Sequence, residues 1–363
     1  PKAARLLVRA LKEEVGLPVH LHTHDTSSLA AATIMAASES GVDIIDVAMD
    51  SFSGGTSQPC FGSVVSALND TECDTGIDPA VVRELNAYWE QVRDKYSDFE
   101  SGLKSPASEV YLHEMPGGQF TNLKAQARSL GLGDRWQQIA KTYADVNQMF
   151  GDIVKVTPSS KVVGDMALMM VAQDLTRSDV ENPSIDLNFP KSVVDMLRGD
   201  LGQPPGGFPE HIVRKVLKDK KPDISRPGKR IPMVDLIAAK DEAQKIIGKQ
   251  EVTEEDLFSY LMYPKVFQDY LLHHSQFGPV RCLPTSVFFY GMENSQEISV
   301  EIDPGKTLEI RLQAVSEVNE EGDRKVFFEL NGQPRIIRIP DQNISISKTH
   351  QKPKANSNNP KHL

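Results

Sequence analysis

Three histidines and an aspartate gather in the segment LPVHLHTHDTSS, which spans residues 17–28. In an extended segment alternate side chains share a side, so His22 and His24 would project together with Cα atoms roughly 6.7 Å apart. Such a pair suits two ligands of one metal ion, whereas His20 lies earlier and is the weakest of the three candidates. Structural zinc takes four protein ligands and catalytic metals take three, so further ligands would come from elsewhere. The alternative is a polar seam of hydrogen-bonded imidazoles, and these residues alone leave both interpretations open.

A second group of polar side chains is VTPSSK at residues 156–161, directly after the apolar segment DIVKV that predicts a strand. Thr157, Ser159 and Ser160 offer hydroxyls and Lys161 offers a cation, a set that can hold a polar ligand or relay a proton. The alternative is a plain helix start, with Thr157 as the N-cap and Pro158 in the first helical position.

The third candidate is PGGQFTN at residues 116–122. Its two glycines permit close backbone approach, and the Gln119 amide can both donate and accept hydrogen bonds. The alternative is an ordinary turn. SFSGGTSQP at residues 51–59 is a similar loop, and neither glycine stretch matches a phosphate-binding loop.

The elements that would position these side chains alternate in type. Apolar periodicity predicts a helix over residues 3–15, a strand over 19–24, a helix over 29–40 and a strand over 43–49. This order implies parallel strands with right-handed crossovers, hence an open doubly wound sheet or a (β/α)₈ barrel. The pattern does not choose between them, but in both folds function collects at the carboxyl ends of the strands.

Residues 177–274 are predicted to be mainly helical, and Thr253 with Asp256 forms a pattern close to a capping box. From Thr285 the period changes to two, and Asn331–Gly332 is a strong hairpin signal. The sequence therefore predicts a small antiparallel β module, with strands over residues 286–291, 297–302, 307–315, 325–330 and 334–339.

Length and composition bound the possible functions. The 363 residues exceed the usual single-domain length, and 39% hydrophobic with 25% charged residues is typical of a globular protein. A net charge of −10 argues against a nucleic-acid surface, and no apolar run approaches the ~20 residues of a membrane span. The three scattered cysteines indicate reduced thiols. Because the chain starts at Pro1 in helix-like material, we expect a piece of a longer protein.

The order of these segments resembles the pyruvate carboxylase family over essentially the whole chain. It is carried by HLHTHDT, DSFSGGTSQP, PGGQFTNL, GDIVKVTPSSKVVGDMA, GGFPE, RPGKR and VFFELNGQPR. The resemblance implies the C-terminal part of a (β/α)₈ TIM-type carboxyltransferase barrel over residues 1–175 and a helical funnel over 176–280. It further implies an allosteric and tetramerisation β module over 281–340, and a linker over 341–363 leading to a biotin carrier domain.

The same resemblance implies an ATP- and biotin-dependent ligase that carboxylates pyruvate to oxaloacetate. A divalent metal, Mn or Zn, would be bound by His22 and His24 together with an aspartate and a carboxylated lysine that would precede Pro1. A threonine that matches Thr157 would shuttle a proton between pyruvate and biotin, with the biotin pocket formed by Ser160, Lys161 and Gln119. The full-length family member would be a homotetramer, in the mitochondrial matrix of a eukaryote and otherwise in the cytoplasm.

Three other interpretations are weighed against this one. An oxaloacetate decarboxylase or transcarboxylase subunit would share the chemistry, and acyl-CoA lyases and synthases share the barrel and the His-x-His strand. The β module speaks against the lyases and synthases. A non-enzymatic interpretation makes the chain an assembly piece whose β module and helices drive association. On the first interpretation the piece alone is expected to be inactive and poorly soluble.

Overall fold

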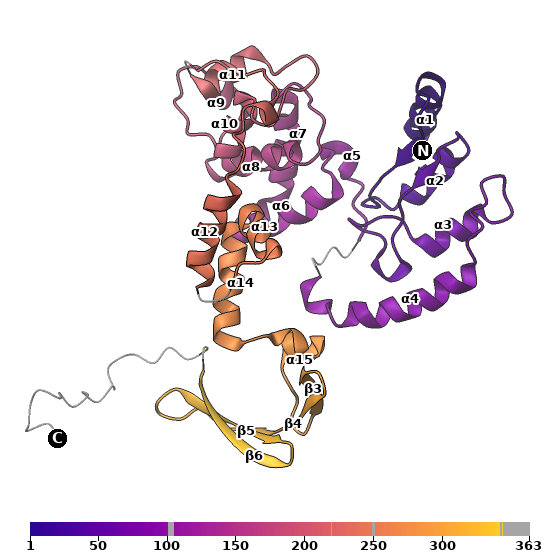
Figure 1. The fold of residues 1–363 in the computed structure, drawn as a ribbon. Coiled ribbons are helices and arrows are strands. Elements are labelled where there is room, and N and C mark those ends of the chain that lie inside the picture. The colour runs from indigo at the N-terminus through magenta and orange to yellow at the C-terminus, as the bar shows by residue number, and fades with distance from the viewer. Residues whose placement is uncertain (101–104, 219, 249–250, 342, 344–363) are drawn as a thin grey trace, which may run out of the picture. The chain divides into compact units, whose positions relative to one another are not determined.

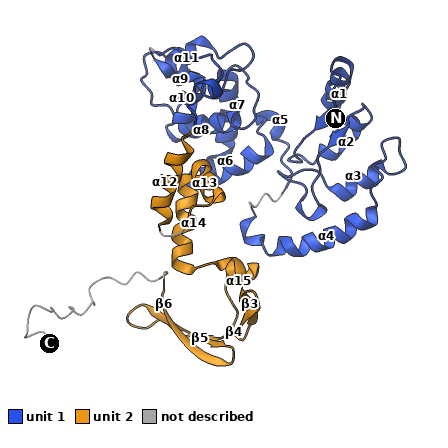
Figure 2. Ribbon diagram, viewed as in Figure 1, with its two compact units in different colours: residues 1–233 blue, residues 234–363 orange. Residues whose placement is uncertain are grey.

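The computed structural model describes residues 1–100, 105–218, 220–248, 251–341 and 343 (Figure 1). It forms two compact units, Pro1–Met233 and Val234–Leu363 (Figure 2). The finer division at residues 175, 280 and 340 stays a prediction, and the expected linker over 341–363 lies almost wholly outside the described residues. No helix in the described ranges has both the length and the apolar character needed to cross a membrane.

The first part of unit 1 has a two-stranded parallel sheet with helices around it (Figure 1). His20 pairs with Ile44 and Leu21 with Ile45, which confirms the predicted parallel arrangement of these two segments. The elements are α1 (Lys2–Glu14), β1 (His20–Leu21), α2 (Ala30–Ser38), β2 (Ile44–Ile45), η1 (Asp50–Phe52), α3 (Phe61–Leu68), α4 (Pro79–Asp94) and η2 (Ser97–Phe99).

Both strands are shorter than predicted. The Asp46 N–H donates to the Leu21 carbonyl oxygen at 3.1 Å, and then the two segments separate. The chain after Leu21 turns to another partner, because the Asp25 N–H donates to the Ser57 carbonyl oxygen at 2.8 Å. His22 and His24 therefore lie in irregular structure beyond the strand, and the prediction of a strand over residues 19–24 is wrong in its second half.

The rest of unit 1 is helical and contains the largest apolar core. Its centre is α8, whose residues Val163, Met166 and Ala167 are fully buried, packed with α6, α7 and α10. The elements are α5 (Val110–His113), α6 (Gly117–Ser129), η3 (Gly133–Arg135), α7 (Trp136–Met149), α8 (Ser159–Ala172), α9 (Arg177–Glu181), α10 (Lys191–Arg198), α11 (Glu210–Leu217) and η4 (Pro227–Lys229).

Three local interpretations of this part are wrong. The segment DIVKV over residues 152–156 is not a strand, because the Ser159 hydroxyl satisfies its backbone instead of a neighbouring strand. That hydroxyl accepts from the Val156 N–H at 3.1 Å and lies 2.7 Å from the carbonyl oxygens of Val154 and Val156. Helix α8 begins at Ser159 with Pro158 at the N-cap and no side-chain cap, so Thr157 does not cap it. PGGQFTN is not a turn but the start of α6.

Unit 2 is a group of helices followed by an antiparallel sheet of order β3-β4-β5-β6. The predicted capping box is confirmed, since Thr253 and Asp256 bond reciprocally at the start of α13. The predicted hairpin is also confirmed, with φ of 48° at Asn331 and 78° at Gly332. The elements are α12 (Leu236–Ile247), α13 (Glu254–Met262), α14 (Pro264–Phe277), η5 (Val280–Cys282), α15 (Thr285–Tyr290), β3 (Glu297–Asp303), β4 (Lys306–Val315), β5 (Asp323–Leu330) and β6 (Gln333–Pro340).

The first strand predicted for this module, over residues 286–291, is instead α15. Pro284 precedes the helix and Gly291, with φ of 75°, follows it, and these two residues are typical helix boundaries. The three consecutive aromatic residues of this segment have high β propensity, but a strand forms only where a partner strand accepts its hydrogen bonds.

Candidate functional site

The three histidines are held by two different acceptors. The carboxylate of Asp46, which follows β2, lies 2.7 Å from His20 Nε2 through Oδ1 and 2.7 Å from His22 Nδ1 through Oδ2. His24 Nδ1 lies 2.6 Å from the carbonyl oxygen of Thr56. The His22 and His24 rings are edge to face, with centroids 5.1 Å apart. The histidine pair is therefore close together although it is not on a strand.

These contacts determine the tautomers of His22 and His24. A carbonyl oxygen only accepts hydrogen bonds, so His24 carries its proton on Nδ1. The same holds for His22, because the two imidazoles keep the pKa of Asp46 below its usual value and the carboxylate ionised. In the neutral form of each ring the Nε2 lone pair is then free. His20 differs because its Nε2 is the atom that contacts Asp46.

The donor set fits a divalent metal. Metal-binding histidines commonly direct their second nitrogen to a carboxylate or a backbone carbonyl, as His22 and His24 do here. The side chain of His22 is 57% exposed, so its free nitrogen is accessible. In the described ranges no set of three or more His, Cys, Asp or Glu side chains is arranged to hold a metal ion. By itself the pair would contribute two ligands to such an ion.

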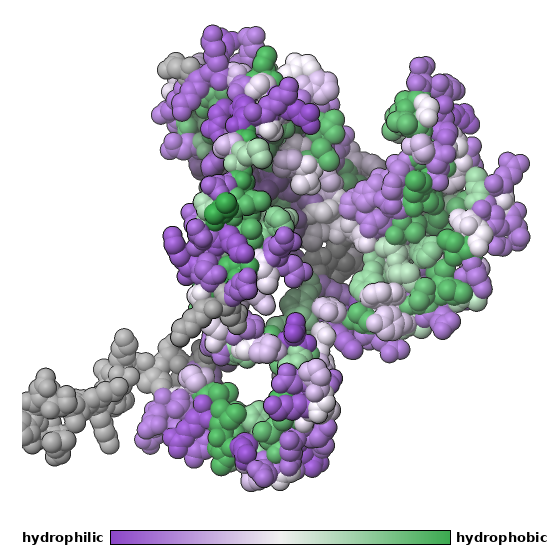
Figure 3. Space-filling model, viewed as in Figure 1, coloured by the Kyte–Doolittle hydropathy of each residue, from purple (hydrophilic) through white to green (hydrophobic). Residues whose placement is uncertain are grey.

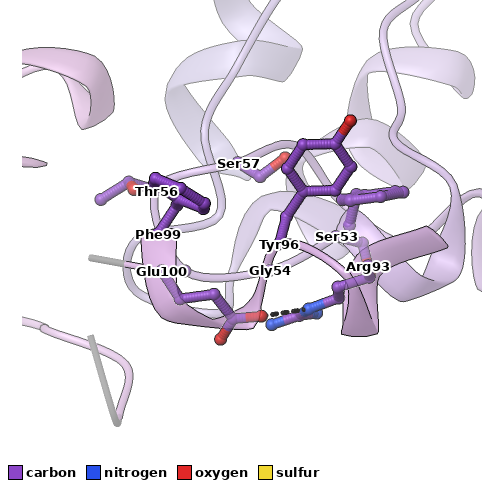
Figure 4. A pocket seen from close by; sticks show the side chains of 10 residues that line it. Ser53, Gly54, Thr56, Ser57, Arg93, Tyr96, Phe99 and Glu100 are labelled. Atoms are coloured by element: carbon purple, nitrogen blue, oxygen red, sulfur yellow. Dashed lines mark hydrogen bonds and ion pairs between the residues drawn. The ribbon is translucent and has the colours of Figure 1, made fainter. Parts of the chain in front are cut away.

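The loop that supplies the Thr56 carbonyl also borders a pocket of about 400 Å³ (Figure 4). Its walls are residues 52–57 and the segment from Arg93 to Glu100 at the end of α4. Arg93 binds Glu100 at 2.6 Å and donates to the Ser51 carbonyl oxygen, so it fastens the loop to α4. The loop is therefore held at Ser51 by Arg93 and at Thr56 by His24.

The residues predicted around α8 have different environments. Thr157 is exposed, whereas Ser160 is buried and its carbonyl oxygen accepts from the Tyr143 hydroxyl at 3.4 Å. Burial raises the pKa of Tyr143, so this hydroxyl stays protonated. Lys161 is exposed, and its ammonium lies 2.8 Å from Asp165. The Ser192 hydroxyl donates to the same Asp165 oxygen at 2.7 Å, which ties this ion pair to α10.

Helix α6 is the element that contacts both groups of candidate residues. Gly117 lies against the His24 ring, and the Gln119 amide lies against Gly164 of α8. One turn further, the hydroxyls of Thr121 and Thr56 are 2.7 Å apart. The site residues that the sequence analysis missed are Asp46, Thr56, Thr121 and Asp165. Asp46 had a signal, because it follows β2 as His22 follows β1, at the same edge of the sheet.

Comparison with known proteins gives a consistent result. The family model of the conserved carboxylase domain matches residues 110–311. Pyruvate carboxylase of Bacillus subtilis is 48% identical over 100% of this chain, and mitochondrial pyruvate carboxylase of Homo sapiens is 44% identical over 98%. The chain covers 31% and 30% of these two relatives, about a third of their length.

Solved structures agree. The carboxyl transferase domain of Rhizobium etli pyruvate carboxylase, solved with pyruvate and biocytin, is 59% identical with a TM-score of 0.88, over 94% of this chain and 57% of that chain. The complete multifunctional enzyme from the same organism gives a TM-score of 0.87 at 59% identity, over 95% of this chain and 34% of that chain. The chain therefore belongs to the conserved carboxylase domain family and is similar, over almost its whole length, to part of the carboxyltransferase domain of pyruvate carboxylases.

Proposed function

We propose that this chain is part of a biotin-dependent carboxylase and that it serves the transfer of a carboxyl group from carboxybiotin to pyruvate, giving oxaloacetate. The similarity to pyruvate carboxylases supports the reaction. The observation that carries the assignment of the site is the tautomer of the histidine pair, since His22 and His24 each direct Nδ1 to an acceptor and leave Nε2 for a metal. A bound divalent metal would act as a Lewis acid that stabilises the enolate form of pyruvate.

Thr157 is the residue that we assign to proton transfer. Its side chain is exposed and does not cap α8, so its hydroxyl is free to face a substrate. Carboxyl transfer needs a proton to leave the methyl group of pyruvate and to reach the ureido nitrogen of biotin after the carboxyl group departs. A hydroxyl can donate one proton while it accepts another, so Thr157 can connect these two atoms without free water.

The biotin pocket is assigned to Lys161, Ser160 and Gln119. Lys161 is 64% exposed, and its ion pair with Asp165 leaves two of its three donor positions for a carbonyl oxygen of biotin. Gln119 reaches the same helix from α6. Ser160 is only 5% exposed, and its N–H and carbonyl oxygen are bound to Val156 and Tyr143, so we assign it to the wall of the pocket. We assign these residues to binding and not to chemistry.

The wider assignments belong to the same proposal. Residues 1–175 would be part of a (β/α)₈ barrel, 176–280 a helical funnel, 281–340 the β module of a homotetramer, and 341–363 a linker to a biotin carrier domain. The metal would be Mn or Zn, and the compartment the mitochondrial matrix or the cytoplasm according to the source. The family relationship supports the order of these parts along the chain.

The test is carboxylation by a full-length carboxylase that contains residues 1–363. We expect oxaloacetate to form from pyruvate, bicarbonate and ATP, as measured by NADH oxidation through added malate dehydrogenase. Avidin should abolish the signal by trapping biotin. Oxaloacetate consumption without ATP-dependent formation would instead support a decarboxylase or transcarboxylase subunit. Neither activity in a folded, biotinylated protein would contradict the proposal.

A further inference from the structure

Two glycines mark the points where α6 approaches the two groups of candidate residues. A Cβ atom at Gly117 would lie 2.6 Å from His24 Nδ1, 2.7 Å from Cγ and 2.9 Å from Cβ. A Cβ atom at Gly164 would lie 2.4 Å from Gln119 Nε2 and 3.0 Å from Leu123 Cδ1. Both glycines are buried, and neither needs glycine for its backbone dihedral angles, so their missing side chains serve close packing.

The approach at Gly117 acts on a ring that has little freedom to move. His24 Nδ1 is already bound to the Thr56 carbonyl oxygen at 2.6 Å, and the Thr56 hydroxyl contacts Thr121 of α6 at 2.7 Å. An added methyl group at residue 117 would press on the first carbon of the His24 side chain as well as on its ring. Rotation of the ring would relieve the clash only by breaking the bond to Thr56.

The approach at Gly164 acts on a flexible side chain instead. The nearest atom to the virtual Cβ is the terminal amide nitrogen of Gln119. An alanine at residue 164 would therefore displace this amide, and it would also crowd Leu123 of α6. Gln119 is in the first turn of the same helix that begins at Gly117.

From these contacts we infer that the first turn of α6, residues 117–119, sets the position of the His24 imidazole relative to α8, and that Gly117 and Gly164 are positioning residues for the site. This inference rests on the proposed function for the chemistry that it names. Gly117 acts through the orientation of His24, and Gly164 acts through the placement of the Gln119 amide. Neither glycine touches a substrate.

The chain contains a matched control. Gly118 is in the same turn as Gly117, yet a Cβ atom added there would meet nothing within 4 Å. Gly118→Ala should therefore have the same helix propensity effect as Gly117→Ala and none of its steric effect. A general disturbance of the α6 start would affect both variants alike.

The experiment compares Gly117→Ala, Gly118→Ala and Gly164→Ala in a full-length carboxylase that contains residues 1–363. Tightly bound Mn and Zn are measured by mass spectrometry after dialysis against a graded series of chelator concentrations, and thermal unfolding is recorded in parallel. We expect Gly117→Ala to weaken metal retention by about 10–100-fold, as for other residues that orient a metal-binding histidine. Gly118→Ala and Gly164→Ala should retain metal like the unmodified protein.

An assay of carboxyl transfer tests the positioning role of Gly164 separately from that of Gly117. In full-length protein whose carrier domain is not biotinylated, Gly164→Ala should raise the apparent KM for added free biotin with kcat less affected, and Gln119→Ala should do the same. The double variant should be no worse than either single variant, because both changes remove the same contact. Additive losses would overturn the role of Gly164.

The outcomes distinguish this inference from the proposed function. If the unmodified enzyme fails to carboxylate pyruvate, the proposed function fails while the metal measurement still tests Gly117. If the unmodified enzyme is active and Gly117→Ala retains metal like Gly118→Ala, the positioning role of Gly117 is wrong. Equal metal loss in both variants, accompanied by an equal drop in unfolding temperature, would also overturn it.

Discussion

The two groups of candidate residues in unit 1 rest on supports of different kinds. The histidine pair lies beyond a two-residue strand, where Ile34, Val64 and Leu68 form a small buried apolar cluster among the described residues. Helix α8 is surrounded by the largest apolar cluster of the described residues. The histidines are positioned by directional hydrogen bonds to Asp46 and Thr56, whereas α8 is positioned by close packing. The histidine pair should therefore respond to polar substitutions as well as to crowding by α6, whereas α8 should respond mainly to changes of volume.

The two parts also differ in how far their apolar side chains are exposed. On the face in Figure 3, apolar side chains are exposed along the segment from α1 to α4. In α1, Leu6 and Leu7 are each 61% exposed. Around α8 the large apolar side chains, such as Met166 and Met170, are buried. Burial stabilises by roughly 25 cal/mol for each Å² of apolar surface, so the α8 region has the larger internal stabilisation.

We expect the largest effect from Thr157→Ala, which removes the hydroxyl assigned to proton transfer. Because Thr157 is exposed, unfolding should be unchanged, while carboxyl transfer in a full-length carboxylase should fall by about 10²–10⁴-fold. Bicarbonate-dependent ATP cleavage should be spared, and Thr157→Ser should keep most of the activity. An equal loss of both partial reactions would show that Thr157 is structural.

The two apolar cores can be compared with the same substitution. Ile139 in α7 and Ile34 in α2 are both fully buried, and isoleucine to alanine typically costs about 2–5 kcal/mol. We expect Ile139→Ala to lie near the upper limit, because a densely packed core collapses poorly around a cavity. The loss of stability in Ile34→Ala should lie near the lower limit of this range, because its buried cluster is small. Hydrogen exchange of the α7 and α2 amides measures both local effects, and a reversed order would contradict the comparison.

Asp46→Asn tests the hydrogen-bonded support. The amide would bond less strongly to the imidazoles and would no longer fix the Nδ1–H tautomer of His22, so metal affinity should fall by about 10–100-fold. His20→Gln is the control, because glutamine can still donate to Asp46 and His20 is not assigned as a ligand. Competition with a chromogenic chelator measures both variants. Greater metal loss in His20→Gln than in Asp46→Asn would reverse the ligand assignment.

The smallest effect concerns His113, which is buried at the end of α5. Its Nδ1 accepts from the Met115 N–H at 3.0 Å, and burial lowers its pKa below the ordinary 6.5. Below pH 6.5 the unfolded chain binds a proton that the folded chain does not, so stability should decrease as the pH falls from about 7 to 5. His113→Asn keeps an acceptor and removes the titration, so its unfolding temperature should depend less on pH. If the unfolding temperatures of the variant and of the unmodified protein change with pH in the same way, His113 does not cause the loss of stability.

The sequence analysis was accurate where the signal is local. Thr253 and Asp256 form a capping box because the pattern is complete within one helical turn, and Asn331–Gly332 forms a hairpin because both positions need positive φ. It was wrong at residues 152–156 and 286–291, where apolar runs with β propensity have no strand partner among the described residues. Strand formation depends on a second segment, which a local pattern does not contain.

The sequence by itself determined the family of this chain and the side chains with useful chemistry, because residue types and their order are properties of the chain. Only the tertiary structure shows which partners the histidines of LPVHLHTHDTSS bind. Asp46 is 24 residues from His22, and Thr56 is 32 residues from His24. The tautomers of the histidine pair, and the glycine contacts of α6 with His24 and α8, arise from contacts between segments that are distant in sequence. Such contacts follow from packing, which no single segment specifies.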